Sequence, residues 1–357
     1  MGYRSKNLFV GSILNSEQYP IFSSAFARTS MKTIGFFINT TKPETFEIVP
    51  TTIAWLRKHG IQSLIPSDEA KIIGVDEATD DTASPSSQTG DISPIEPEGV
   101  LTSLTDLDAS STRARADIVS LSDLILVLGG DGTLLNAAHT PGIENVPILA
   151  VNVGHLGFLT DVARDELYPA LSRILVGQYE IDSRMMLEVI LPNGEKRHAL
   201  NDVVIRHHMR LIHLETQINK QPCINYTADG LIVSTPSGST GYSLSCGGSI
   251  AEPHLNAILI TPISPHDLTA RPFITHGDSE IQIAIQAEAT VVDESAGTLL
   301  VDGQREVYSV QPNIPIHIRK AEKTIQLIRS QGRSYYEVLR EKLMFGQGVN
   351  RKVAVND

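Results

Sequence analysis

The sequence has few cysteines and no long apolar run, and each absence excludes a class of protein. Its 357 residues contain only Cys223 and Cys246, and neither belongs to a Cys-x-x-Cys or histidine-rich metal pattern. A structural zinc site is therefore not expected, and a reducing compartment such as the cytoplasm fits best. No stretch approaches the roughly 18 apolar residues that span a bilayer, so we expect no membrane-spanning segment and no membrane partner.

Positive charge is also scarce, which argues against a nucleic-acid partner. Lysine and arginine number 29 against 41 acidic residues, giving a net charge of -12. A nucleic-acid surface needs a basic face that replaces counterions. Any polyanionic ligand must instead meet local positive charge, backbone amides or a metal ion. With 41% hydrophobic residues, a chain of this length is expected to form roughly two domains of about 150 residues each.

Two segments lack the composition of a packed core. Residues 1–30 carry Arg4, Lys6 and Arg28 against one acidic residue, and they lack a clear amphipathic stripe. We favour an N-terminal extension, or a start codon assigned too early, over organellar targeting. Residues 75–112 are acidic, with no basic residue, and rich in serine. This composition predicts a mobile insertion, and a solvated loop without a role is favoured over a regulatory arm.

The first half has the pattern of parallel strands that alternate with helices. Apolar runs at residues 33–39, 61–65 and 124–128 are continuous, as expected for strands buried on both faces. A helix is expected between Pro43 and Gly60, in which Pro50 would produce a kink or mark the start. The apolar residues at helical spacing in this segment are Phe46, Val49, Ile53 and Leu56. A short helix is expected over residues 114–121.

The second half is predicted to be mainly β. Short apolar runs at residues 203–205, 231–234, 257–261, 281–285 and 298–301 are separated by Gly, Pro and Asn turns. Pro192-Asn193-Gly194 predicts a hairpin turn, since Asn and Gly tolerate positive φ. Near the end, Ser334 and Glu337 have capping-box spacing and predict a last helix over residues 335–345.

A glycine-rich pentapeptide, Gly129-Gly130-Asp131-Gly132-Thr133, lies between the strand at 124–128 and a helix expected over 134–139. Open α/β sheets bind ligands at this strand end. Backbone amides and the helix N-terminus can hold a phosphate there. Asp131 would hold a metal ion or accept a proton, both of which serve phosphoryl transfer. The alternative is a tight turn in which Asp131 is only a cap. The segment is neither a Walker loop nor the GxGxxG dinucleotide fingerprint.

This pentapeptide resembles a phosphoryl-transfer loop that NAD kinases share with lipid kinases of the diacylglycerol kinase type and, with Ser for Thr, with phosphofructokinases. A second segment, residues 227–243, separates these families, because it closely resembles the long NAD kinase motif. Gly241 stands where many members have Ala. The segment is dense in hydroxyls and glycines, which suit ribose hydroxyls and amides. An ordinary β-turn is the alternative.

Other segments are also family-like. Asn201-Asp202 resembles a paired Asn-acid motif, often with Glu in second place, that helps to bind the riboses and the nicotinamide end of NAD. Phe158, within residues 154–161, matches an aromatic residue near the adenine. Arg184 and Arg271 are possible supports. The resemblance implies the catalytic residue Asp131 and the following nucleotide-binding residues: Gly129, Gly130, Gly132, Thr133, Phe158, Asn201, Asp202, Asp229, Ser237, Thr240, Gly241, Tyr242 and Ser243.

The fold implied by the resemblance is NAD kinase-like. An α/β domain with a parallel sheet (31–151) precedes a β-rich NAD-binding domain (152–320), and the helix of a C-terminal segment (321–357) returns to the first domain. The implied activity is transfer of the terminal phosphate of ATP, with Mg²⁺ or another divalent metal, to the 2′-hydroxyl of the adenosine ribose of NAD. A homodimer or homotetramer is also implied. A lipid kinase and a non-catalytic NAD(P) sensor are the alternatives. The preference between NAD and NADH, the donor (ATP or polyphosphate) and feedback by NADP(H) stay open.

Overall fold

The computed structural model describes residues 31–73 and 112–344, apart from residues 155, 161, 208, 288–296, 304 and 330–332. The predictions for residues 1–30, for the acidic insertion up to residue 111 and for the tail after residue 344 therefore lie outside the described residues. No helix within the described ranges is long and apolar enough to cross a bilayer.

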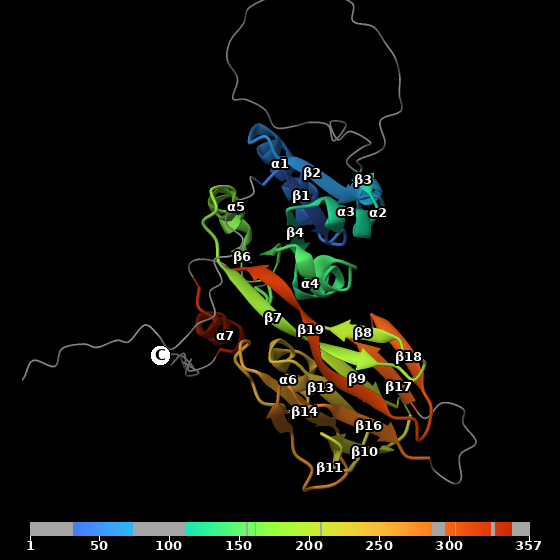
Figure 1. The fold of residues 1–357 in the computed structure, drawn as a ribbon. Helices are drawn as coiled ribbons and strands as arrows, with labels where there is room; N and C mark the ends of the chain where they lie inside the picture. Colours follow the sequence, from blue (N-terminus) through green and yellow to red (C-terminus); the bar gives the residue numbers. More distant parts are fainter. Residues whose placement is uncertain are drawn as a thin grey trace, which may run out of the picture.

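A parallel sheet forms the first part of the molecule (Figure 1). Its strands are β1 (Thr33–Ile38), β2 (Gln62–Pro66), β3 (Thr112–Arg113), β4 (Leu124–Gly129), β5 (Ile148–Asn152) and β6 (Val162–Ala163). The order β5-β4-β1-β2-β3 places β4 beside β1 and β5. Strands β1, β2, β4 and β5 are buried on both faces along almost their whole length, as the continuous apolar runs predict.

Helices cover both faces of this sheet. They are α1 (Pro43–Lys58), α2 (Ser67–Ile73), α3 (Arg115–Leu121), α4 (Asp131–Ala138) and α5 (Leu167–Leu175). Residues of α1 and α5 share one hydrophobic core with Phe36, whereas residues of α3 and α4 share another with Phe37. Since Phe36 and Phe37 point to opposite faces of β1, the two helix pairs lie on opposite sides. The first core thus continues past residue 151, where the sequence predicts the first domain to end.

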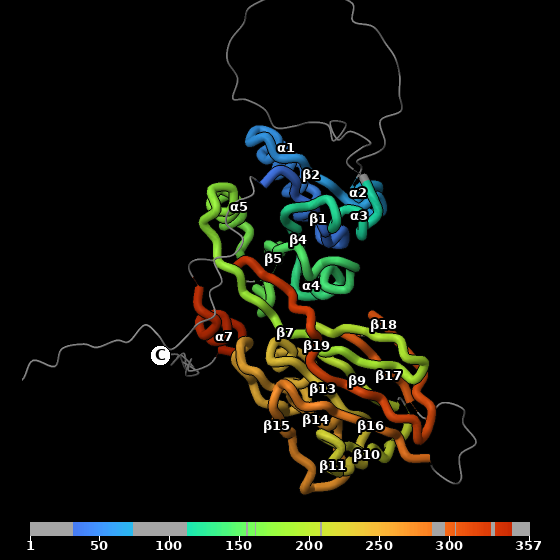
Figure 2. The backbone as a smooth tube through the Cα atoms, viewed as in Figure 1, coloured from blue at the N-terminus to red at the C-terminus, as the bar shows by residue number. Residues whose placement is uncertain are grey.

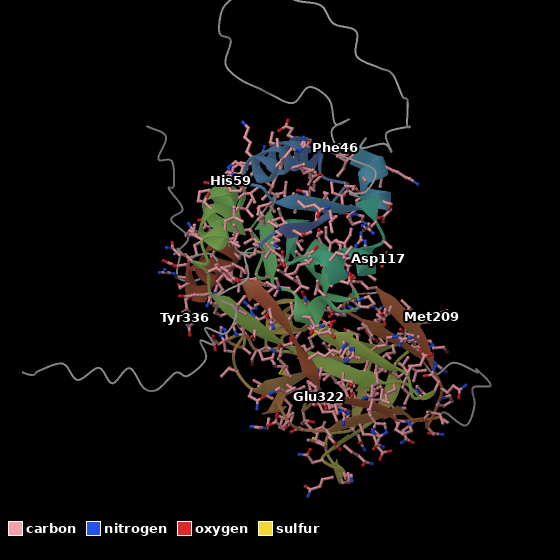
Figure 3. The ribbon with its side chains drawn as sticks, turned by 45° about the horizontal axis from the view of Figure 1, so that its top comes forward. Phe46, His59, Asp117, Met209, Glu322 and Tyr336 are labelled. Atoms are coloured by element: carbon pink, nitrogen blue, oxygen red, sulfur yellow. The ribbon has the colours of Figure 1, made fainter. Side chains whose placement is uncertain are left out.

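Helix α1 differs from the sequence-based expectation at two residues. It begins at Pro43 and continues through Pro50, so it does not begin at Pro50. The Thr51 hydroxyl in the next position donates to the Glu47 carbonyl oxygen at 3.0 Å. Phe46, expected on the apolar face, is 38% exposed and lies at the surface (Figure 3). The buried face is completed instead by threonine and isoleucine residues that the apolar spacing did not include: Thr45, Ile48 and Thr52.

The second part is a β-sandwich. Its strands are β7 (Ile181–Ile190), β8 (Lys196–Ala199), β9 (Asp202–Arg206), β10 (Ile212–Ile218), β11 (Gln221–Pro222), β12 (Tyr226–Ala228), β13 (Gly230–Ser234), β14 (Ala257–Ile263), β15 (Phe273–His276), β16 (Ile281–Ile285), β17 (Gly297–Val301), β18 (Glu306–Val310) and β19 (Ile316–Ile328). Six form a sheet with the order β15-β14-β13-β9-β17-β18. Its apolar face packs against β7, β10, β16 and β19 in one core.

Strand β19 connects the two parts. It pairs with β7 and β16 in the sandwich, and its end pairs in parallel with β5 through Leu327 and Ile148. Figure 2 shows this strand passing from the lower part of the molecule to the upper part. The parallel sheet therefore continues into one layer of the sandwich.

The predicted fold class, a parallel α/β domain followed by a β-rich one, is confirmed. The Pro192-Asn193-Gly194 turn joins β7 to β8, with Gly194 at φ 83°. The last helix, α7 (Tyr335–Leu343), begins with the predicted capping box, in which Ser334 N donates to Glu337 at 2.7 Å. Among its contacts are a hydrogen bond from Tyr335 Oη to the Ala251 carbonyl oxygen at 3.2 Å and a contact of Lys342 with the Phe158 ring.

Candidate active site

The carboxyl ends of β1, β4 and β5 open into a cavity of about 580 Å³, which we call the phosphate cavity. It is lined by Asn39 after β1, by Gly129 and Gly130 at the end of β4, and by Asn152 and Gly154 at the end of β5. Parallel strands end at the same edge, which is where open α/β sheets bind ligands. The predicted glycine loop thus lies at a ligand-sized cavity.

The glycines of the loop serve different purposes. A Cβ on Gly129 would stand 2.2 Å from the Thr133 hydroxyl oxygen, so the turn from β4 into α4 needs glycine for packing. A Cβ on Gly130 would meet nothing within 4 Å, and Gly130, Gly132 and Thr133 all line the cavity. Open space around the backbone at a helix N-terminus suits an anion.

Three cationic side chains line the phosphate cavity: Lys42, Arg115 and Arg305. Arg115 forms an ion pair with buried Glu69 and lies 4.0 Å from Asp68. Burial raises the pKa of Glu69 to about 7, although Arg115 opposes this shift. Lys42 and Arg305 have no carboxylate partner among the residues that the structure describes. The cavity therefore offers unpaired positive charge in an acidic protein.

Asp131 is held by the loop that follows β5. Its carboxylate accepts hydrogen bonds from the amides of Phe158 (2.9 Å), Leu159 (3.1 Å) and Thr160 (3.1 Å), and from the Thr160 hydroxyl at 3.0 Å. Gly157 makes this approach possible, because a Cβ there would stand 1.9 Å from the carboxylate. Asp131 is the first residue of α4 and does not cap its own helix, whose N-cap is Gly130. It joins the glycine loop to the Phe158 segment.

Asn201 and Asp202 stand at the start of β9, where the carboxylate of Asp302 holds them. Buried Asp302 accepts from the amides of Leu200 (2.8 Å), Asn201 (2.7 Å) and Asp202 (3.0 Å). Burial, together with the charge of Asp302, raises the pKa of Asp202 to about 7. The Asn201 Oδ1 atom is buried without a hydrogen-bond partner in the described part of the chain, so it is available to a ligand donor.

The long motif folds over this pair. It supplies β12, β13, the 3-10 helix η5 (Ser237–Thr240) and helix α6 (Tyr242–Ser245). Gly238 packs on the backbone of Asn201, with an added Cβ at 2.1 Å from the Asn201 carbonyl oxygen. A Cβ on Gly241 would lie 3.5 Å from the side-chain nitrogen Nδ2 of Asn201 and 3.8 Å from the Asp202 carboxylate. The two motifs that the sequence predicts to act together are therefore in contact.

The departure of Gly241 from the usual alanine has a small local consequence. An alanine Cβ would approach the Gly238 carbonyl oxygen to 3.2 Å, which requires a shift of a few tenths of an ångström. Other predicted residues of the motif support its fold. The Ser243 hydroxyl is buried and hydrogen bonds to Thr261 at 2.8 Å, and Thr240 donates to the Ser237 carbonyl oxygen. Tyr242 is 36% exposed.

The two arginines named as supports differ in position. Arg184 is buried and donates to the Ser237 hydroxyl at 3.1 Å and to Asp182 at 2.8 Å. His254 also hydrogen bonds to Asp182, so a network of charged side chains contacts η5 through Ser237. Arg271 donates to the Leu268 and Ala270 carbonyl oxygens of its own loop. The structure places Arg184 against the motif, and the described contacts of Arg271 stay outside it.

Two further predicted residues, Phe158 and Asp229, have other surroundings. The backbone N–H of Phe158 donates to Asp131, and the Lys342 ammonium of α7 lies 4.4 Å from the centroid of the Phe158 ring. Asp229, between β12 and β13, pairs through its backbone with Ile263 and His207. Its side chain has no described hydrogen bond to the other predicted site residues.

Sequence reasoning missed Lys42, Arg115, Arg305 and Asp302. A usable signal existed for Lys42, since Asn39 and Lys42 follow a strand predicted to be parallel to the one before the glycine loop. The other three carried no local pattern, because only the fold brings them to the cavity and the loop.

The phosphate cavity fits a metal ion that arrives with phosphates better than a metal held by protein alone. Among the described residues, no group of three His, Cys, Asp or Glu side chains could hold an ion. Mg²⁺ usually binds one or two carboxylates together with phosphate oxygens and water. Asp68, whose side chain is 70% exposed, lines the cavity and could supply one such ligand.

Two family models match this chain. The ATP-NAD kinase N-terminal domain matches residues 34–179, and the ATP-NAD kinase C-terminal domain matches residues 200–330. The NAD kinase of Geotalea daltonii is 40% identical over 323 residues, which cover 89% of this chain and 100% of the relative. The NAD kinase of Heliobacterium modesticaldum is 36% identical over 326 residues, with the same coverage.

Solved structures agree with these matches. Yeast NADH kinase complexed with NADH superposes with a TM-score of 0.73 at 26% identity, covering 90% of each chain. An NAD kinase from Archaeoglobus fulgidus in complex with ATP has the same fold, with a TM-score of 0.61 at 17% identity over 86% of this chain and 98% of that one. With both family models and full-length relatives matched, the chain belongs to the ATP-NAD kinase family.

Proposed function

We propose that this chain transfers the terminal phosphate of ATP to the 2′-hydroxyl of the adenosine ribose of NAD, which yields NADP and ADP. The observation that carries the proposal is the phosphate cavity, a glycine loop and unpaired cations at the ends of three parallel strands. Phosphoryl transfer needs positioning and electrostatic stabilisation more than a nucleophilic side chain. The relatives named NAD kinase, and the solved structures with NADH and with ATP, support both substrates.

The donor is assigned to the phosphate cavity. Gly129, Gly130, Gly132 and Thr133 present backbone amides and a hydroxyl to its phosphates, and Lys42 supplies charge. Mg²⁺ or another divalent ion would neutralise the phosphate oxygens when bound, and Asp68, the more exposed of the two carboxylates that line the cavity, would supply a ligand. No other metal ligand is assigned.

The acceptor is assigned to the side of the glycine loop that carries Asp131. Asp131 accepts the proton of the 2′-hydroxyl or orients this hydroxyl. The hydrogen bonds from residues 158–160 fix the orientation of the Asp131 carboxylate. Asn201 offers its unpartnered oxygen to a ligand donor, and Asp202 is close enough to bind the same ligand. The remaining contacts with the riboses, nicotinamide and adenine are assigned to Phe158, Asp229, Ser237, Thr240, Gly241, Tyr242 and Ser243, with Arg184 as a support behind Ser237.

We also propose a homodimer or homotetramer in the cytoplasm. The two cysteines are free, which suits a reducing compartment. Light scattering coupled to size exclusion would give the oligomer size directly. A monomer at micromolar concentration would exclude the oligomer while leaving the activity open.

Initial rates of the purified chain with each pair of donor and acceptor test the activity. We expect NADP formation from ATP and NAD that requires Mg²⁺. The same assay with NADH in place of NAD gives the acceptor preference, and with polyphosphate in place of ATP it gives the donor preference. Phosphorylation of diacylglycerol in mixed micelles, without NADP formation, would favour the lipid kinase alternative. Tight NAD binding without turnover would favour the sensor.

A further inference from the structure

The turn between β17 and β18 holds helix α4 at both ends, although it comes from the other part of the molecule. At the start of α4, the Arg305 guanidinium donates to the Gly132 carbonyl oxygen of the glycine loop. At its end, His139 Nε2 hydrogen bonds to Asp302 at 2.9 Å. Figure 1 shows β17 and β18 below α4. The turn is therefore fixed relative to the glycine loop.

Arg305 is directed at the phosphate cavity. It lines this cavity together with Gly129, Gly130, Gly132 and Thr133. A guanidinium carries five N–H donors, and the bond to Gly132 uses only one of them. In the described part of the chain, Arg305 has no other hydrogen bond and no ion pair. Its remaining donors are free for a ligand.

The charge around Arg305 favours an anion. Burial lowers the pKa of Arg305, and the cationic Arg115 adds to this effect, while Asp302 opposes it. An arginine stays charged at neutral pH despite such shifts. Two guanidinium groups that face one cavity repel each other, and an anion between them would remove the repulsion. The terminal phosphate of a nucleotide has the charge and the planar oxygen pairs that arginine binds best.

We propose that Arg305 is a catalytic residue that binds the terminal phosphate of the donor. The inference rests on the proposed donor cavity. During transfer, a bond forms between the acceptor 2′-oxygen and the γ-phosphorus, and the bond from the γ-phosphorus to the β–γ bridging oxygen breaks. The hydroxyl proton goes to Asp131, and ADP leaves. Arg305 stabilises the negative charge on the phosphoryl oxygens in the transition state, as arginine does in other phosphoryl transferases.

Asp302 anchors the turn that carries Arg305. Its carboxylate is buried and accepts from three successive amides as well as from His139. The turn thus joins the acceptor loop at residues 200–202 to the donor cavity. This link explains how a residue outside the α/β part can be held accurately over the glycine loop.

The test is Arg305→Met, with Arg197→Met as the matched control. Arg197 of β8 donates at 2.6 Å to Tyr308, which lies on the β17–β18 hairpin that carries Arg305, but Arg197 lines a different cavity. For Arg305→Met we expect kcat to fall by about 10² to 10³, as for loss of one strong transition-state donor. The KM for NAD should stay within about threefold, and Arg305→Lys should recover part of the rate. Arg197→Met should keep kcat within about twofold.

Equilibrium binding separates this role from a structural one. Because the lost contact is with the terminal phosphate, Arg305→Met should weaken binding of a non-hydrolysable ATP analogue by at least about tenfold and binding of ADP much less. A lower melting temperature, together with equal decreases in affinity for NAD, the ATP analogue and ADP, would show that Arg305 only supports Gly132. A near-normal kcat would also overturn the proposal. If the unaltered chain makes no NADP, the proposed function fails, and the two nucleotide affinities still decide the role of Arg305.

Discussion

At the residue scale, the carboxylates of the site differ in what surrounds them. Asp131 accepts four hydrogen bonds from the loop at 158–160, whereas Asp202 is buried, and its pKa is raised. Because Asn keeps the size and hydrogen-bonding shape of Asp, the sequence alone predicts that Asp131→Asn changes stability little. The structure leads us to expect a loss of stability instead, since an amide nitrogen in place of Oδ2 would face the Phe158 amide, which needs an acceptor.

We expect Asp131→Asn to lower kcat by about 10² to 10⁴ and to lower the melting temperature as well. The matched variant is Thr160→Val, which removes one donor to Asp131 at 3.0 Å and leaves the carboxylate intact. If Asp131 acts in catalysis, kcat should fall far more for Asp131→Asn than for Thr160→Val. Equal losses of kcat in step with melting temperature would reduce Asp131 to an anchor of the loop.

Asp202 gives a pH dependence of stability with a defined sign. Because burial raises its folded-state pKa from 3.8 to about 7, the folded protein holds a proton that the unfolded chain releases. The free energy of unfolding should therefore decrease between about pH 4 and pH 7, by at most about 4 kcal/mol from this group. In urea denaturation, Asp202→Asn should show a smaller decrease over the same range. An unchanged slope in that variant would contradict the assignment.

At the element scale, the turn between β17 and β18 connects α4 with the acceptor loop. Asp302→Asn should destabilise the protein by roughly 2–4 kcal/mol, since a buried charged acceptor of three amides is lost. Glu306→Gln is the control, because Glu306 lies 3.6 Å from the same His139 but is partly exposed, and should cost less than about 1 kcal/mol. The KM for NAD should rise in Asp302→Asn only. Equal denaturation midpoints for the two variants would show that the turn does not stabilise the loop.

Elements were predictable from the sequence where one local pattern determined them. The continuous apolar runs gave β1 and β4, and the capping box gave the start of α7, because these signals lie within a few residues. Phe46 was misplaced, since apolar spacing does not count threonines, whereas Thr45 and Thr52 are fully buried on the inner face of α1. The contacts of Asp131 with residues 158–160 and of Asp302 with residues 200–202 could not be foreseen. Each joins segments that only the folded chain brings together.

At the scale of the whole molecule, the described core begins at β1. A chain that starts at Met31 should fold and keep full activity, because the core that the structure describes is built from β1 onward, with Ile34 among its first residues. Melting temperature and kcat, compared with those of the full chain, provide the measurement. An insoluble or inactive product would give residues 1–30 a role in the fold or in catalysis.

The domain boundary is also a matter of the whole molecule. We place the end of the first domain after α5, because Leu171 and Ile174 pack in the core that contains Phe36. The family match over residues 34–179 supports this position. With this boundary, the proposed site combines Asp131 of the first part with Asn201 of the second.

Transfer of the terminal phosphate of ATP to the 2′-oxygen of NAD, with Asp131 in the reaction, is measured most directly by phosphorus NMR. The reaction contains ATP, Mg²⁺ and NAD, and Asp131→Asn is run in parallel. We expect a new 2′-phosphomonoester signal that grows in step with ADP, and a rate lower by about 10² or more in the variant. A phosphate at another position, ADP without a phosphorylated dinucleotide, or equal rates in both proteins would contradict this expectation.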